Sequence, residues 1–305
     1  MDTRGAYANL TLPALLTERG LHGRDAALAT ELAYGTLRHQ GTYDAILAAC
    51  VDRPLDAVGP AVRDVLRLGV HQVLATRMPP HASVATAVDL GASAVGRRVT
   101  GFVNAVLRAV TRRDLDAWVD AVAPARADDP VGYLAVAHSH PRWVVEAFAD
   151  ALDEDIVGDL TETAALLAAD NVPPAVTLVA RPGRGSVADL VALGATPTRW
   201  SPYGAVLADG DPADLQPVRD GRAGVQDEGS QLVALALPAV PVEGGERRWV
   251  DLCAGPGGKA ALLAGLATGR GARVLAVERQ PHRPRKVEQA LRGDSGGHRV
   301  LVADG

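Results

Sequence analysis

The sequence predicts a multidomain protein: an all-α helical bundle comes first, then a small α+β segment, then part of an α/β domain with a parallel sheet. Three observations lead to this prediction. Apolar residues recur at helical spacing up to about residue 125, short strand-like runs begin after Asn171, and strands alternate with helices after Gly224. A chain of 305 residues is long enough for roughly two or three domains with separate cores.

The first part, residues 1–125, is predicted to be wholly helical. Apolar residues follow helical spacing most clearly over 62–74 and 102–110, and prolines such as Pro54 and Pro60 mark turns between helices. Cys50 lies on one of these helices and is expected in the core. Together these stretches predict a small helical bundle.

A helical linker over 126–170 and a small α+β segment over 171–223 are expected next. The linker follows a stretch rich in proline and aspartate, and Ser186 is expected to cap a helix in the α+β segment. The expected elements are helices over 143–152 and 159–169, a strand over 175–179, a helix over 186–193 and a strand over 199–207.

Residues 224–305 show the most regular alternation. The expected elements are a strand over 248–253, a helix over 259–267, a strand over 273–277, a helix over 284–291 and a strand over 298–303. Such alternation implies right-handed crossovers and a parallel sheet. Pro284 suits the first turn of its helix, where no backbone N–H is needed. Three strands make only half of a doubly wound sheet, so we expect one uncovered edge and poor order or aggregation after about residue 225.

The loop Ala254-Gly-Pro-Gly-Gly-Lys259 follows the first of these strands and precedes its helix. Glycines let the backbone turn tightly and approach a ligand closely, and a helix N-terminus offers free N–H groups to an anion. Glu278 ends the next strand, about 20 residues on, where an acid can accept hydrogen bonds from a ribose. These features predict a site for a nucleoside that carries a carboxylate or a phosphate.

Three cofactors could use such a loop. A nucleotide-triphosphate loop is disfavoured, because Cys253 replaces its first glycine and Ala260 replaces its serine or threonine. A dinucleotide fingerprint is formally satisfied over 255–260, but a lone match of that kind is weak. S-adenosylmethionine fits with its amino-acid tail over the glycine turn, its ribose at Glu278 and its adenine at Asp304. A turn that merely connects strand and helix would not need these two acids.

Several motifs resemble those of the NOL1/NOP2/Sun family of RNA 5-methylcytosine methyltransferases. The stretch DLCAGPGGKA, 251–260, closely resembles the family's cofactor loop DLCAAPGGKT, and VQDEGSQ, 225–231, is similar to the segment that precedes it. The N-terminal half resembles a NusB-like RNA-binding domain through ELAYGTLR at 31–38, LRLGVHQVL at 66–74 and GFVNAVLR at 101–108. The resemblance covers nearly the whole chain.

The resemblance implies S-adenosylmethionine as the cofactor and a Rossmann-like methyltransferase domain over 224–305. The implied cofactor-binding residues are Cys253, Ala254, Gly255, Pro256, Gly257, Gly258, Lys259, Glu278 and Asp304. Ala260 stands where the family usually has threonine, and Glu278 stands where aspartate is more frequent. Both departures are mild, since a longer acid still reaches a ribose.

The family's reaction needs a cysteine thiolate that adds to C6 of cytosine, and a second cysteine that helps to remove the C5 proton. The resemblance places both cysteines downstream of the third strand, in Pro-Cys and Thr-Cys sequences. Neither Cys50 nor Cys253 stands in such a context. We therefore expect no catalytic residue in this chain, which ends before them and alone is expected to be inactive. Cys253 is expected to be a small buried residue at a strand end.

Charge and composition add expectations about partners. The net charge is −5, yet the stretch 97–113 has five arginines and no acid. These arginines are candidates for contact with RNA phosphates: Arg97, Arg98, Arg108, Arg112 and Arg113. No signal peptide, membrane segment or metal-ligand spacing is evident, and two distant cysteines suit a reducing cytoplasm. The complete protein is expected to be a cytoplasmic monomer.

The resemblance implies methylation of cytosine C5 in small-subunit (16S) ribosomal RNA. A non-enzymatic NusB-like RNA-binding protein, active in transcription or ribosome assembly, is the alternative. A nucleotide-dependent oxidoreductase is a more distant one.

Overall fold

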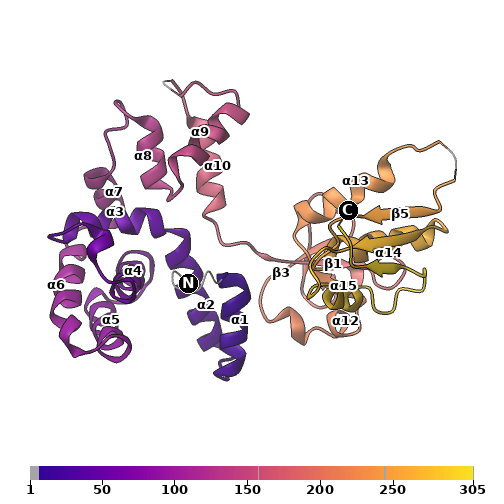
Figure 1. Cartoon of the computed structure of the whole chain (residues 1–305), viewed down its shortest axis with the longest axis horizontal. Helices are drawn as coiled ribbons and strands as arrows, with labels where there is room; N and C mark the ends of the chain where they lie inside the picture. The colour runs from indigo at the N-terminus through magenta and orange to yellow at the C-terminus, as the bar shows by residue number, and fades with distance from the viewer. Residues whose placement is uncertain (1–6, 157, 244, 305) are drawn as a thin grey trace. The chain divides into compact units, whose positions relative to one another are not determined.

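The computed structural model describes residues 7–156, 158–243 and 245–304. The chain forms two compact units that divide between Pro173 and Pro174. Figure 1 shows the first unit in indigo to pink and the second in salmon pink through orange to yellow. The first unit is helical and the second combines sheets with helices, so the predicted fold class is confirmed.

The first unit begins with seven α-helices. They are α1 (Ala8–Glu18), α2 (Gly23–Arg38), α3 (Gln40–Cys50), α4 (Pro60–Ala75), α5 (Pro80–Ala94), α6 (Thr100–Val110) and α7 (Leu115–Val122). Prolines begin α4 and α5 at positions where a helix needs no N–H donor. These elements agree with the helical character predicted for 1–125, of which residues 1–6 lie outside the described structure.

The core of these helices lies around α4. Its apolar residues Val65, Leu66 and Val70 are buried against α3, α5 and α6. Gly69 lets α6 approach closely, because a Cβ there would stand 2.5 Å from a methyl carbon of Leu107. Cys50 packs at the edge of this core and is partly buried.

Residues 126–170, expected to be a helical linker, form helices that pack against one another. These are α8 (Pro130–Ala137), α9 (Arg142–Ala151) and α10 (Thr161–Asp170). They enclose a core of their own that includes Leu134, Val145 and Leu167. Asp129 caps α8 through the N–H of Gly132 and also binds Arg142 at 2.7 Å, which joins α8 to α9.

The second unit begins with a four-stranded antiparallel sheet in the order β2-β3-β1-β4. Its strands are β1 (Val176–Ala180), β2 (Thr196–Pro197), β3 (Gly204–Leu207) and β4 (Ala223–Val225). Between β1 and β2, α11 (Val187–Val191) begins with a capping box in which Ser186 and Asp189 exchange hydrogen bonds, so the predicted cap is confirmed. β2 and β4 were not predicted, because each is too short to show an alternating pattern.

A parallel sheet in the order β5-β6-β7 follows, reached through α12 (Gln216–Arg219) and α13 (Glu228–Ala239). Its elements are β5 (Arg248–Asp251), α14 (Gly258–Gly269), β6 (Arg273–Val277), α15 (Pro284–Ala290) and β7 (Arg299–Leu301). The first and last strands are shorter than predicted, whereas β6 has the predicted bounds. β5 is an edge strand, and Val250 on it is 47% exposed.

Helix α14 is the element on which the second unit is assembled. Its alanines and leucines are buried together with Trp249 and Val274 of the parallel sheet and with Val179 of the antiparallel sheet. Gly265 allows this contact, since a Cβ there would stand 2.7 Å from the carbonyl oxygen of Pro182. Within the described ranges, no helix is long and apolar enough to cross a membrane.

Candidate cofactor pocket and arginine surface

The glycine loop leaves β5 at Asp251 and enters α14 at Gly258. Gly257 has a φ of +117°, a backbone conformation that residues with a side chain rarely adopt. A Cβ on Gly257 would also stand 2.6 Å from the Cβ of Ala290. The N–H of Ala254 donates to the carbonyl of Val277 at 2.9 Å, which holds the loop at the carboxyl end of β6. The conformation of the loop and its close packing therefore require glycine at position 257.

Glu278 lies directly against this loop. A Cβ on Gly255 would overlap the Glu278 carboxylate, so the glycine is what allows the two to approach. The carboxylate is buried and accepts the N–H of Gln280 at 2.7 Å. A buried acid at the end of β6, touching a glycine turn, is the arrangement expected of a ribose-binding residue.

A pocket opens where the loop meets the segment after β4. It is lined by Val225, Gln226, Asp227, Ser230, Cys253, Ala254, Gly255, Pro256, Gly258 and Lys259. Six of the seven loop residues predicted to bind a cofactor line it, whereas Gly257 and the predicted ribose-binding Glu278 do not. Residues 225–231 were noted in the sequence as part of a family motif, but no function was predicted for them.

Asp251 adds an unpaired acceptor at the base of the loop. Its Oδ1 accepts the N–H of Cys253 at 3.1 Å, while its buried Oδ2 has no hydrogen-bond partner in the described structure. Buried polar atoms are usually paired, so such an atom is typical of a place where a ligand or water completes the bonding.

Two predicted residues differ from expectation. Cys253 is exposed, not buried, because β5 ends at Asp251 and the chain has already left the sheet at this point. Asp304 lies beyond the end of β7 at Leu301, where its exposed carboxylate is 3.9 Å from Nε of Arg279. It does not line the pocket, so its contact with an adenine stays a prediction.

The five arginines lie near the two ends of α6. Arg97 and Arg98 precede the helix, and Arg108, Arg112 and Arg113 lie in or after its last turn; all are exposed. An 11-residue helix is about 16 Å long, so the structure does not gather them into one cluster. The guanidinium of Arg113 stacks over Trp118 at 5.1 Å.

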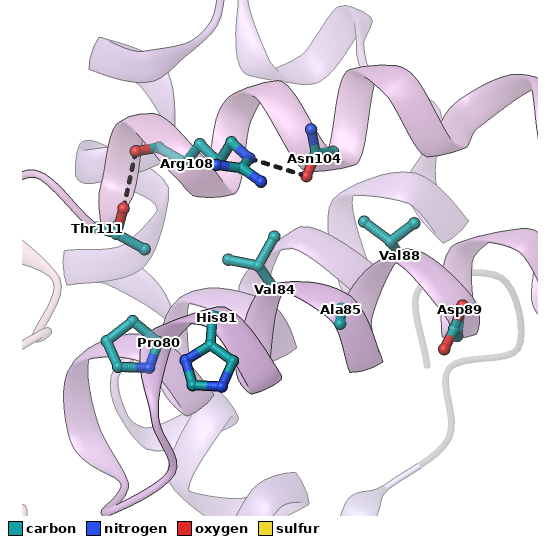
Figure 2. Close-up of a pocket in the computed structure, with 9 residues that line it drawn as sticks. All are labelled: Pro80, His81, Val84, Ala85, Val88, Asp89, Asn104, Arg108 and Thr111. Atoms are coloured by element: carbon teal, nitrogen blue, oxygen red, sulfur yellow. Dashed lines mark hydrogen bonds between the residues drawn. The ribbon is translucent and has the colours of Figure 1, made fainter.

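Arg108 borders a groove between α5 and α6 (Figure 2). Its Nε donates to Oδ1 of Asn104 at 3.2 Å, so both side chains are held along the α6 wall. Val84 and Val88 of α5 form the opposite wall, with His81 near one end. The groove thus offers a fixed guanidinium next to an apolar wall.

Comparison with known proteins identifies both ends of the chain. Residues 1–112 match the NusB family, and residues 239–304 match the family described as 16S rRNA methyltransferase RsmB/F. The chain is therefore similar to the NusB family over its first 112 residues and to the RsmB/F methyltransferase family over residues 239–304. The NusB match covers α1 to α6, and the glycine loop with Glu278 lies within the segment that matches the methyltransferase family.

Individual similar proteins are named as methyltransferases. A Mycobacterium tuberculosis protein named "Putative methyltransferase" is 52% identical over 96% of this chain and 64% of its own length. The ribosomal RNA small subunit methyltransferase B of Pseudomonas putida is 31% identical over 94% of this chain and 62% of its own. This chain therefore spans less than two thirds of these relatives.

The crystal structure of PH0851 matches 95% of this chain and 63% of its own, with a TM-score of 0.69 and 18% identity. At this identity the match shows a shared fold alone.

Proposed function

We propose that the second unit binds S-adenosylmethionine, and that the protein methylates C5 of a cytosine in 16S ribosomal RNA. The contact between the glycine loop and the buried Glu278 carboxylate supports the cofactor, and the names of the relatives support the ribosomal substrate. S-adenosylmethionine would supply an electrophilic methyl group on a sulfonium.

The chain's own residues would bind and orient this cofactor. The loop and the N-terminus of α14 would receive the amino-acid end, and Glu278 would accept hydrogen bonds from the ribose hydroxyls. We assign no nucleophile here. Burial raises the pKa of the Cys50 thiol, which disfavours a thiolate, and Cys253 belongs to the cofactor loop.

Calorimetric titration of the chain with S-adenosylmethionine, and separately with NAD, tests the cofactor. We expect heat from the first ligand only, and an affinity at least about tenfold lower in Glu278→Gln, because a neutral amide accepts hydrogen bonds from a ribose less strongly. Binding of NAD alone would support an oxidoreductase instead.

Transfer of a labelled methyl group from S-adenosylmethionine to 16S ribosomal RNA tests the reaction, and digestion of the RNA to nucleosides identifies the methylated position. This methyl-transfer assay should use a protein that spans the full length of the relatives, because the present chain covers less than two thirds of it. Binding of RNA without methyl transfer would favour the non-enzymatic NusB-like alternative.

A further inference from the structure

Gln226 lines the pocket with a buried side-chain amide that has no hydrogen-bond partner among the described residues. Its backbone is fixed, because its N–H donates to Thr177 at 2.9 Å and its carbonyl accepts Nε2 of Gln231 at 2.9 Å. Its side chain is only 7% exposed, yet neither Nε2 nor Oε1 has a hydrogen-bond partner in the described structure. A buried amide without hydrogen-bond partners destabilises the folded protein, so its presence here indicates a functional role, such as binding a ligand.

The amide faces the start of α14. Its Cδ and Oε1 lie 3.8 Å from the point where a Cβ on Gly258 would stand. None of the hydrogen bonds among the described residues is donated by the backbone N–H groups of Gly258, Lys259 or Ala260, the first of the helix. A free amide and free helix N–H groups therefore border the same pocket.

The surroundings favour an anion. Arg181, at the end of β1, is buried and its Nη1 donates to the carbonyl of Gly258 at 3.1 Å. Burial, together with the neighbouring Arg184, lowers the pKa of Arg181 to about 10, so it remains charged at neutral pH. No ion pair among the described residues neutralises it, and the positive end of the α14 dipole adds to its field.

We propose that Gln226 binds the amino-acid end of the methyl donor, an α-amino carboxylate. Its NH₂ group would donate to the carboxylate, and its carbonyl oxygen would accept from the ammonium group. Arg181 would act as a positioning residue, holding the Gly258 carbonyl and supplying positive charge. This inference rests on the proposed function, because it names the part of the cofactor that this wall of the pocket recognises.

Comparing the affinities of two thioether ligands distinguishes the Gln226 contact from the contacts made by the rest of the site. S-adenosylhomocysteine has the amino-acid end, whereas 5′-methylthioadenosine has the same adenosine and sulfur but no amino acid. In calorimetric titrations, Gln226→Ala should weaken S-adenosylhomocysteine about tenfold and change 5′-methylthioadenosine by less than about twofold. Gln226→Glu should weaken S-adenosylhomocysteine further, because a carboxylate there repels the ligand's carboxylate.

The unchanged affinity for 5′-methylthioadenosine also serves as the control for folding. Equal losses for both ligands, or no loss for either, would overturn the role of Gln226 while leaving the cofactor assignment intact. If the unsubstituted chain bound none of these three ligands, S-adenosylmethionine included, the proposed function would be wrong. The proposed role of Gln226, which depends on it, would then be wrong as well.

Discussion

At the scale of single residues, the candidate site depends on one close approach, that of Gly255 to Glu278. The loop can pass over the buried carboxylate only because residue 255 has no side chain. The sequence motif contains this glycine and this acid, and the structure shows that they are in contact.

Gly255→Ala should weaken S-adenosylmethionine at least about tenfold, since the new methyl group must displace the loop or the carboxylate of Glu278. Titration calorimetry measures the loss. Gly269→Ala is a matched control, because it lies in α14 and a Cβ there meets nothing within 4 Å. An affinity unchanged in Gly255→Ala would show that the loop does not contact the ligand.

His71 predicts a pH dependence of stability in the helical unit. Burial lowers its pKa, and Glu31, with Oε1 3.8 Å from Nε2, opposes only part of this shift. The unfolded chain therefore binds the proton more readily, and stability should fall as the pH drops below about 6.5. Thermal melts at pH 7.5 and 5.5 should show a smaller difference for His71→Gln than for the unsubstituted chain. An equal difference would exclude His71 as a source of the pH dependence.

At the scale of elements, α6 separates the arginines that the sequence presents as one run. Arg112 and Arg113 lie beyond its C-terminal end, and Arg97 and Arg98 precede it. The two pairs can therefore be tested separately.

Replacing Arg112 and Arg113 together with alanine should make the salt dependence of RNA binding less steep. Each lost contact with a single-stranded phosphate makes the negative slope of log K against log salt shallower by about 0.7, so the loss of two contacts should reduce its magnitude by about 1.4. Filter binding at several salt concentrations measures the slope. Arg97→Ala with Arg98→Ala provides the parallel measurement at the other end of α6. A slope that neither pair changes would remove both from the RNA interface.

At the scale of the whole molecule, the chain consists of two units with separate cores. The candidate cofactor pocket lies wholly in the second unit, at the start of α14 and in the segment after β4. A ligand that binds there should stabilise that unit without changing the helical one.

Hydrogen exchange with and without S-adenosylhomocysteine tests this separation. At about 100 times the dissociation constant, binding should stabilise the second unit by about 2.7 kcal/mol and slow exchange in α14 and β6. Amides of α4 and α6, buried in the other unit, serve as the internal control. Slower exchange in those helices would show that the two units are coupled.

Local sequence patterns were enough to predict the helical unit, the capped α11, the bounds of β6 and the glycine loop. These features depend on local patterns: apolar residues at helical spacing, a serine before a helix, and glycines between a strand and a helix. The short strands β2 and β4 were beyond the reach of such patterns, because pairing with β3 and β1 defines them.

The residues that lie beside the loop could not be predicted, because they come from distant parts of the chain. Arg181 reaches Gly258 across 77 positions of sequence, and Gln226 arrives because the antiparallel sheet packs on α14. Cys253 was expected to be buried at a strand end, but β5 ends before it and leaves it exposed. The physical reason is the same throughout: periodicity and turn chemistry act over a few residues, whereas burial and the loss of hydrogen-bond partners depend on which distant elements pack together.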